Sequence, residues 1–399
     1  MALTVIGLNF NTAPLKIREQ IHFRADSLKT AYTHLKTQST LTTAIVLATC
    51  NRVELYTYGE DHENLFAASL KFIADFHDIA AKIITPFMYK MHGSRAVLHL
   101  FKVTAGLKSM VIGENQILSQ VKLAYAEARK HQFVTTEISR AFEQALAAGK
   151  QVRTQTKINE GGTSLGSVAI DFIKELYDTT QVAVTLVGAG EMGKEVLRTL
   201  TAYKPKQITL VNRNIKKAQT LGNQFQATVK PLAERYNVIS SSDIVICSVE
   251  SQEYLIKKTP FINALNKKSK VIIFIDLSVP RSIDPALEEL EDIVLYTIDD
   301  LKKIIDRTML KRQKEIQAAL EIINNFEADF SLWETKRTFL KMFGNFNGSP
   351  AEINQALQYY HKKKHNLKST SKNDISHSKA LEQLIASLMK GKKNSSPPK

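Results

Sequence analysis

The strongest constraint on this chain is the run Gly188-Ala189-Gly190-Glu191-Met192-Gly193, which lies between an apolar segment and an amphipathic one. The apolar segment, residues 181–187, predicts a β-strand, and the residues after the run predict a helix. In that context the glycines allow a tight turn, close approach of a pyrophosphate to the backbone, and packing of helix against strand. We predict a dinucleotide-binding loop here, with a simple packing turn as the alternative.

The end of the next predicted strand indicates which dinucleotide binds. It has the sequence Val211-Asn212-Arg213-Asn214, with no carboxylate to hold the ribose of NAD. A guanidinium at this point suits the 2′-phosphate of NADP, because it pairs with phosphate through two N–H groups. We therefore predict that Asn212 and Arg213 contact NADPH, although Arg213 could simply be an exposed residue that begins a helix.

Two fold types follow one another along the chain. Apolar strands alternate with helical segments from residue 181 to 280, which predicts a doubly wound parallel sheet of the Rossmann type. Before it, residues 3–10 and 43–59 predict strands, the second interrupted at Asn51-Arg52, with a helix from residue 28 that Asp26 or Ser27 could cap. The first region is therefore α+β.

Helical periodicity is extensive elsewhere. It covers residues 62–80, 94–107 and 114–150, and helices continue to Gly161-Gly162. One predicted stripe consists of Ile117, Val121, Tyr125 and Ala128. A second amphipathic stretch runs from residue 299 to about residue 342. Its apolar residues are Ile316, Leu320, Ile323, Phe326, Phe330 and Trp333.

Length and composition narrow the class of protein. A chain of 399 residues with 44% hydrophobic residues can bury cores for two or three domains. It contains no apolar run of the roughly 20 residues that cross a bilayer, and its N-terminus has no export signal, so we expect a cytosolic protein without membrane contact. Its two cysteines cannot form a disulfide framework, and no Cys/His spacing predicts a metal site.

The chain is basic, with a formal charge of +15, and about half of that excess lies after residue 339. A strongly basic protein suits a polyanionic partner such as a nucleic acid. The segment 346–399 is rich in Lys, Ser and Asn, which predicts a flexible tail. Whether this tail contacts nucleic acid or only aids solubility stays open.

The two cysteines differ in context. Cys247 lies within an apolar run typical of a buried parallel strand, where cysteine acts as a small hydrophobic residue. Cys50 ends an apolar strand where polar Asn51 and charged Arg52 begin, and a guanidinium beside a thiol can lower the thiol pKa. Cys50 is therefore a candidate nucleophile, with a half-buried structural cysteine as the alternative.

Seven segments together make the chain closely resemble the glutamyl-tRNA reductases. They are GLNFNTAPLKIRE (7–19), ATCNRVELY (48–56), AVLHLFKVTAGLKSMVIGENQILSQVKLAY (96–125), VGAGEMG (187–193), VNRN (211–214), DLSVPRSIDP (276–285) and LYTIDDL (295–301). The resemblance implies NADPH-dependent reduction of glutamyl-tRNA(Glu) to glutamate-1-semialdehyde for tetrapyrrole synthesis. It also implies a homodimer, with an aminotransferase as a further possible partner.

The resemblance implies three domains and a basic tail. An α+β catalytic domain would cover residues 1–157, a Rossmann-type NADPH domain residues 158–297, and a helical dimerisation domain residues 298–345. The tail would then cover residues 346–399.

The resemblance also assigns roles to residues. Cys50 would attack the aminoacyl ester, release the tRNA and hold the glutamyl group as a thioester, which is easier to reduce than an ester. Arg52 would bind the substrate γ-carboxylate and Glu114 its α-ammonium, while His99 would act as an acid, a base or an orienting group. The other predicted substrate-binding residues are Thr49, Asn51, Ser109, Gln116 and Gln120.

Without the resemblance, the sequence also allows purely structural roles for His99 and for the residues around Ser109. His99 lies on an apolar stretch and could be a core histidine, and Ser109 or Asn115 could cap a helix. The chain also departs from the family's common pattern, with Phe10 where a histidine is usual and Ser119 where a glycine is usual.

Two rival functions stay open. A dehydrogenase of the shikimate type would explain residues 181–250 but would give no role to Cys50. An RNA-binding module that has kept a nucleotide-binding fold would consume no NADPH.

Overall fold

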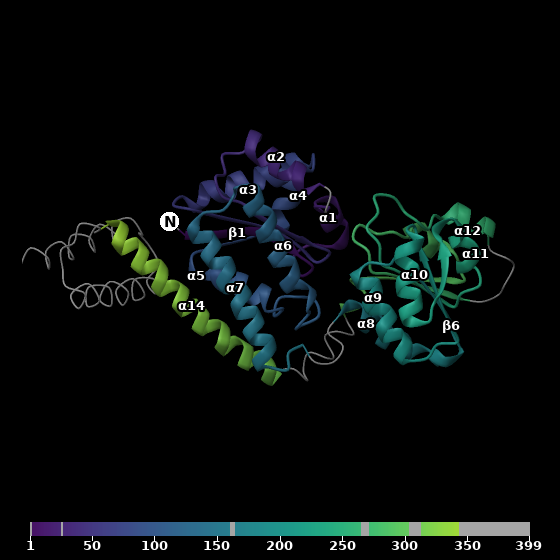
Figure 1. Cartoon of the computed structure of the whole chain (residues 1–399). Helices are drawn as coiled ribbons and strands as arrows, with labels where there is room; N and C mark the ends of the chain where they lie inside the picture. The colour runs from purple at the N-terminus through teal and green to yellow at the C-terminus, as the bar shows by residue number, and fades with distance from the viewer. Residues whose placement is uncertain (1, 25–26, 160–163, 265–270, 303–312, 343–399) are drawn as a thin grey trace, which may run out of the picture. The chain divides into compact units, whose positions relative to one another are not determined.

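The computed structural model describes residues 2–24, 27–159, 164–264, 271–302 and 313–342 of the chain (Figure 1). The chain divides into two compact units, residues 1–324 and 325–399. The predicted basic tail, the capping residue Asp26 and the glycine pair Gly161-Gly162 lie outside the described residues. Within the described ranges, every helix is too short or too polar to traverse a bilayer.

An antiparallel sheet lies at the centre of the N-terminal part, with the strand order β2-β3-β1-β4. Nearly every residue of β1 and β3 is buried, so both faces of the sheet are covered. The first three strands confirm the prediction. The fourth strand was not predicted, because its four residues alternate between half-buried and exposed and form no apolar run in the sequence. The strands are β1 (Ala2–Asn9), β2 (Ile45–Thr49), β3 (Arg52–Gly59) and β4 (Tyr89–His92).

The turn between β2 and β3 lies one residue earlier than predicted. It consists of Cys50 and Asn51, and Arg52 already begins β3. The hydroxyl oxygen of Thr49 accepts hydrogen bonds from the backbone N–H groups of Asn51 and Arg52, at 3.1 and 3.2 Å, which closes the turn. Cys50 is therefore outside the strand ladder and belongs to a two-residue hairpin turn.

Helices surround this sheet (Figure 1). Helix α3 (His62–Phe76) contacts β1 and β3, α5 (Ser94–Thr104) contacts β1 and β4, α6 (Gln116–Lys130) contacts β2, and α7 (Thr136–Gln155) contacts β3. The predicted stripe on α6 is buried, which confirms it. The shorter helices of this part are α1 (Leu15–Gln20), α2 (Leu28–Gln38), α4 (Ala81–Ile84) and the 3₁₀ turn η1 (Thr85–Phe87).

Two details of the helix prediction are wrong. Helices α6 and α7 are separate, because Gln132 between them has a left-handed φ of 64° that ends α6. Ser27 lies at the N-cap position of α2, but its side chain makes no capping hydrogen bond.

A six-stranded parallel sheet forms the second part, in the order β10-β9-β8-β5-β6-β7. It confirms the predicted doubly wound fold and adds two edge strands, β7 and β10. The strand order reverses at β5, which is the position where such sheets bind nucleotides at their carboxyl ends. The strands are β5 (Ala183–Val187), β6 (Gln207–Asn212), β7 (Thr228–Pro231), β8 (Ile244–Cys247), β9 (Ile272–Asp276) and β10 (Ile293–Thr297).

Helices cover both faces of the parallel sheet. One apolar core contains residues of α8, α9 and α10, and the other contains residues of α11 and α12. The first core also includes Leu15, Met110 and Val111 of the N-terminal part, so the two parts share apolar packing. The helices are α8 (Leu165–Leu176), α9 (Glu191–Ala202), α10 (Ile215–Phe225), α11 (Arg235–Ile239) and α12 (Lys258–Ala264), with 3₁₀ turns η2 (Thr179–Gln181), η3 (Leu232–Glu234) and η4 (Pro285–Glu289).

Helix α14 (Gln313–Met342) confirms the predicted C-terminal helical stretch and crosses the boundary between the two compact units. Of its predicted stripe, Ile323 and Phe330 are buried, and the other four residues are half-buried. Within the second unit, the Trp333 ring lies 5.6 Å from the Phe330 ring, centroid to centroid.

Candidate functional site

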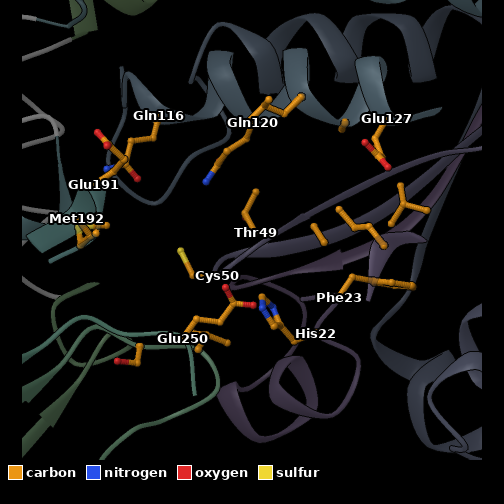
Figure 2. A pocket seen from close by; sticks show the side chains of 18 of the residues that line it. His22, Phe23, Thr49, Cys50, Gln116, Gln120, Glu127, Glu191, Met192 and Glu250 are labelled. Atoms are coloured by element: carbon orange, nitrogen blue, oxygen red, sulfur yellow. The ribbon is translucent and has the colours of Figure 1, made fainter. Parts of the chain in front are cut away.

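The Cys50 thiol lies in the β2–β3 turn and is half-buried. Figure 2 shows its sulfur pointing into a cavity. Burial raises the pKa of Cys50 to about 12, the negative charge of Glu114 acts in the same direction, and Arg18 and Arg52 only partly oppose them. Arg52 thus acts in the predicted direction, but burial outweighs it and the pKa of Cys50 is raised overall.

Arg52 is not free to face the cavity, because its guanidinium is engaged below the turn. Its Nη1 donates to Glu54 Oε1 at 2.7 Å, and its Nη2 donates to the backbone oxygen of Lys108. Both Arg52 and Glu54 are almost completely buried. The expected open fork of Arg52 thus forms a buried ion pair that supports the hairpin in this structure.

Glu54 is the centre of a buried hydrogen-bond network. Besides Arg52, it accepts hydrogen bonds from Tyr56 Oη at 2.6 Å and Tyr89 Oη at 2.5 Å. Burial alone would raise its pKa, but the charge of Arg52 and the contact with His99 outweigh burial and hold the pKa of Glu54 well below its usual range. The carboxylate therefore stays ionised.

Gly7 makes room for this carboxylate side chain. It lies opposite Glu54 in the register of β1 and β3. A Cβ on residue 7 would come within 2.7 Å of Glu54 Cγ, which is closer than carbon atoms pack. The network therefore needs a glycine on the neighbouring strand.

His99 belongs to the network and not to the cavity wall. It is buried on α5, and its Nε2 lies 2.8 Å from Glu54 Oε1. The ring of Tyr89 packs beside it, with centroids 5.4 Å apart. His99 therefore touches the site through Glu54, which fits the predicted orienting role better than direct proton transfer.

Glu114 lies at the end of a tight loop after α5. The loop contains Gly106 and Gly113, both with positive φ, and a Cβ at Gly113 would meet the Ile158 oxygen at 2.0 Å. Burial raises the pKa of Glu114 to about 7, and the charge of Glu195 on α9 adds to that rise. Ser109 lies beside this carboxyl and slightly opposes the rise.

The cavity has a volume of about 670 Å³ and is lined by both parts of the compact unit. On one side, it is lined by four of the candidate site residues, Thr49, Cys50, Gln116 and Gln120 (Figure 2). The buried Gln116 Nε2 has no hydrogen-bond partner among the described residues, so it can donate to a ligand oxygen. The predicted residues outside the lining are Asn51, Arg52, His99, Ser109 and Glu114.

The opposite wall comes from the carboxyl ends of β5, β8 and β9. It includes Gly190, Glu191 and Met192 of the glycine run, together with Ser248 and Val249 after β8. Figure 2 shows Glu191 and Met192 across the cavity from the Cys50 hairpin. This wall lies at the reversal point of the sheet, so a nucleotide bound there would face the thiol.

The glycine run meets the geometric requirements for a dinucleotide. Gly188 has a φ of 119°, and a Cβ there would meet the Ser248 oxygen at 2.2 Å, so the turn needs glycine. A Cβ at Gly193 would lie 2.4 Å from the Gly188 oxygen, which makes this glycine necessary for helix packing. A Cβ at Gly190 would meet no atom within 4 Å, so this side is open to a ligand at the N-terminus of α9.

The remaining predicted cofactor residues lie inside this loop or at the end of the next strand. Ala189 is buried in the core, and Asn212 ends β6, with its amide donating to the Asn214 oxygen at 2.9 Å. Arg213 is exposed just beyond this strand, beside exposed Lys216 and Lys217. No cluster of three or more potential metal ligands is present in the part of the chain that the structure describes.

Two charged residues that the predictions missed support the Cys50 turn, Arg18 and Glu54. Arg18 is 2% exposed, and its Nη1 donates to the Cys50 carbonyl oxygen at 2.8 Å. Both residues could have been found from the sequence, because each is a charged residue within a mostly apolar segment. Charged residues are rarely buried unless they are paired, so such a position predicts a buried ion pair.

Known protein families match the two parts of the chain separately. The family profile described as "Glutamyl-tRNAGlu reductase, N-terminal domain" matches residues 6–156, and the profile "Shikimate / quinate 5-dehydrogenase" matches residues 172–304. Among solved structures, the chain is similar to glutamyl-tRNA reductase from Methanopyrus kandleri, at 25% identity and a TM-score of 0.45, covering 97% of this chain and 94% of that one.

Curated relatives match over most of their length. Glutamyl-tRNA reductase of Thermodesulfovibrio yellowstonii is 36% identical, covering 84% of this chain and 80% of the relative. The enzyme of Priestia megaterium is 34% identical, covering 80% of this chain and 73% of the relative. The chain therefore belongs to the glutamyl-tRNA reductase family and is an oxidoreductase.

Proposed function

We propose that this protein reduces glutamyl-tRNA(Glu) to glutamate-1-semialdehyde with NADPH, and that it does so through a thioester on Cys50. Family membership places the enzyme at the first step of the C5 route to tetrapyrroles. The observation that carries the finer proposal is one cavity with the Cys50 thiol on one wall and the dinucleotide loop on the other. A rival of the shikimate type would leave this thiol without a role.

In the first step, Cys50 Sγ attacks the carbonyl carbon of the aminoacyl ester. A C–S bond forms, the bond to the terminal ribose oxygen of the tRNA breaks, and the thiol proton goes to that oxygen. Gln116 Nε2, which is buried and has no hydrogen-bond partner within the described ranges, would donate to an oxygen of the glutamyl group. Thr49 and Gln120 form the neighbouring wall.

The high pKa of Cys50 requires help from the substrate. Glu114 is one of the charges that oppose the thiolate. Pairing of Glu114 with the substrate α-ammonium would cancel that charge, which makes the thiolate easier to form when substrate is bound. Glutamate would thus assist its own transfer, and an unliganded enzyme would keep an unreactive thiol.

Arg52 and His99 act on this step from below the turn. Their shared contact with Glu54 fixes the conformation of the hairpin that carries Cys50. The carbonyl oxygen of Cys50 is held in addition by Arg18. We therefore assign Arg52 and His99 as positioning residues, and a direct contact of Arg52 with the substrate γ-carboxylate would require it to leave Glu54.

The residues after β5 and β6 fit NADPH. Gly190 leaves open space at the N-terminus of α9 for the pyrophosphate, and Arg213 provides a cation for the 2′-phosphate. When bound there, NADPH would supply the hydride that converts the thioester to the aldehyde, with Cys50 leaving as a thiolate that takes a proton from solvent to become the thiol again. Glu191 and Met192 would face the reacting carbon from the loop side.

We also propose a homodimer formed through the apolar stripe of α14. Its half-buried members, Ile316, Leu320, Phe326 and Trp333, provide accessible apolar surface. Sedimentation at micromolar concentration tests this, and a monomer would contradict it.

A glutamyl-tRNA reduction assay tests the function. Wild type should form aldehyde and consume NADPH with charged tRNA but not with free small hydroxy acids. Cys50→Ser should do neither, and Cys247→Ala, which changes the other cysteine at the end of β8, should keep most activity. Normal reduction by Cys50→Ser would overturn the thioester.

A further inference from the structure

Helix α1 carries two charged residues that reach from the N-terminal part to the NADPH-binding part. Arg18 Nη2 pairs with the Asp299 carboxylate, and Glu19 accepts from Arg281. The second contact is bidentate, with Arg281 Nε and Nη2 each 2.9 Å from a Glu19 oxygen, and the Arg281 backbone N–H adds a third bond at 2.8 Å. Such paired geometry is the strongest form of side-chain hydrogen bonding.

The loop before α1 continues the same interface. Lys302 Nζ donates to Asn11 Oδ1 at 2.8 Å and lies 5.4 Å from the centre of the Phe10 ring. Leu15 joins Ile298 and Leu301 in one apolar core beneath these polar contacts. We define these contacts of residues 10–19 with residues 281–302 as the α1 seam.

The seam also reaches the nucleophile. The guanidinium of Arg18 that pairs with Asp299 holds the Cys50 carbonyl oxygen through its other terminal nitrogen. Arg18 is 2% exposed, so its guanidinium makes both contacts from a buried position. One buried side chain thus joins the turn that carries the thiol to the segment that follows the last strand of the nucleotide-binding sheet.

We propose that the α1 seam is a latch that holds the cofactor-binding part against the Cys50 hairpin during reduction, with Arg18 as the positioning residue that couples closure to the thiol. This inference rests on the proposed function. Acyl transfer as proposed uses groups of the N-terminal part alone, whereas reduction needs both walls of the cavity within bonding distance and water excluded. The latch therefore serves the second step and protects the thioester from hydrolysis.

The test measures two rates in each variant of the full-length protein. One is the discharge of glutamyl-tRNA without NADPH, and the other is aldehyde formation with NADPH. The variants are Asp299→Asn, which removes the charge facing Arg18, and Glu19→Gln. Glu289→Gln is the matched control, because its ion pair with Lys258 lies entirely inside the nucleotide-binding part.

The seam variants should keep discharge within about twofold of wild type but lower aldehyde formation about tenfold, the usual effect of losing one charge-assisted hydrogen bond. Without NADPH, the half-life of the glutamyl-enzyme should shorten by a similar factor, which a purely structural role would not cause. The exchange Glu19→Arg with Arg281→Glu should restore the ratio of the two rates. The control should match wild type.

The failures are distinguishable. If discharge and reduction fall together, or if the ratio stays at the wild-type value, the latch is wrong. If wild type discharges no tRNA through Cys50, the proposed function itself fails, and the latch falls with it.

Discussion

The two walls of the cavity are built in different ways. The cofactor wall, at the carboxyl ends of β5, β8 and β9, is shaped by the conformation of the backbone. Its glycines Gly188, Gly190 and Gly193 provide a turn, an opening and a packing contact, respectively. The thiol wall depends on buried side chains, since Arg52 and Glu54 lie beneath the Cys50 turn with almost no exposed surface. A substitution on the cofactor wall should therefore change either stability or cofactor binding. A substitution beneath the thiol wall should change stability and activity together.

Glu54→Gln should have the largest effect on stability. It leaves the Arg52 guanidinium buried without a charged partner, which costs about 3 to 5 kcal/mol of unfolding free energy. Denaturant titration measures this. Asp75→Asn, which breaks an exposed ion pair with Lys71, is the control and should change stability by less than about 0.5 kcal/mol. Equal effects of the two would contradict the buried network.

Glu114→Gln should make stability less dependent on pH. The folded protein keeps the Glu114 proton up to about pH 7, whereas the unfolded chain loses it near the ordinary glutamate pKa of 4.5. Wild type therefore loses stability as pH rises through this window, by about 3 kcal/mol in total. Denaturation midpoints of the variant and wild type should coincide near pH 4, separate as the pH rises to about 7, and stay apart above it, with the variant more stable. Parallel profiles would contradict the raised pKa.

Substitutions of Gly193 and Gly190 on the cofactor wall should have different effects, the first on stability and the second on cofactor binding. Gly193→Ala should destabilise the protein by about 1 to 3 kcal/mol, because the new Cβ meets the Gly188 oxygen. Gly190→Ala should leave the melting temperature unchanged and instead weaken NADPH binding, measured by fluorescence titration. If Gly190→Ala binds NADPH normally, the open space is not the cofactor site.

Arg213→Ser should have the smallest effect. Removing the cation should weaken NADPH binding about tenfold, the loss expected for one charge-assisted contact, without changing NADH binding. Lys206→Ser on the loop before β6 serves as a charge-matched control. An equal loss for both cofactors would show that Arg213 does not read the 2′-phosphate.

The cofactor wall was predictable because its signals are local. The glycine run, the strand before it and the helix after it are adjacent in sequence, and each follows from short-range rules. The same applies to the buried stripe of α6 and to strands β1, β2 and β3. The short strand β4 and the break at Gln132 were not predictable, because four residues and a single left-handed residue leave no periodic signal.

The thiol wall was predictable only in part. Sequence placed Cys50 near the end of a strand, but the partners of Glu54 lie far along the chain at Tyr89 and His99. Proximity to Arg52 suggested a lowered thiol pKa, yet the guanidinium is engaged by Glu54 and burial dominates. The environment of the thiol is set by buried charges that pair over long distances in the chain. Composition and residue spacing do not predict such pairs.

Mass spectrometry of the intact protein and of its peptides after acid digestion tests the central claim most directly, on samples mixed with glutamyl-tRNA without NADPH and quenched rapidly with acid. The account predicts a mass increase of one glutamyl residue on the peptide that contains Cys50, absent in Cys50→Ser and lost when NADPH is added. Reduction of glutamyl-tRNA with no such adduct at any time, or an adduct on Cys247, would contradict it.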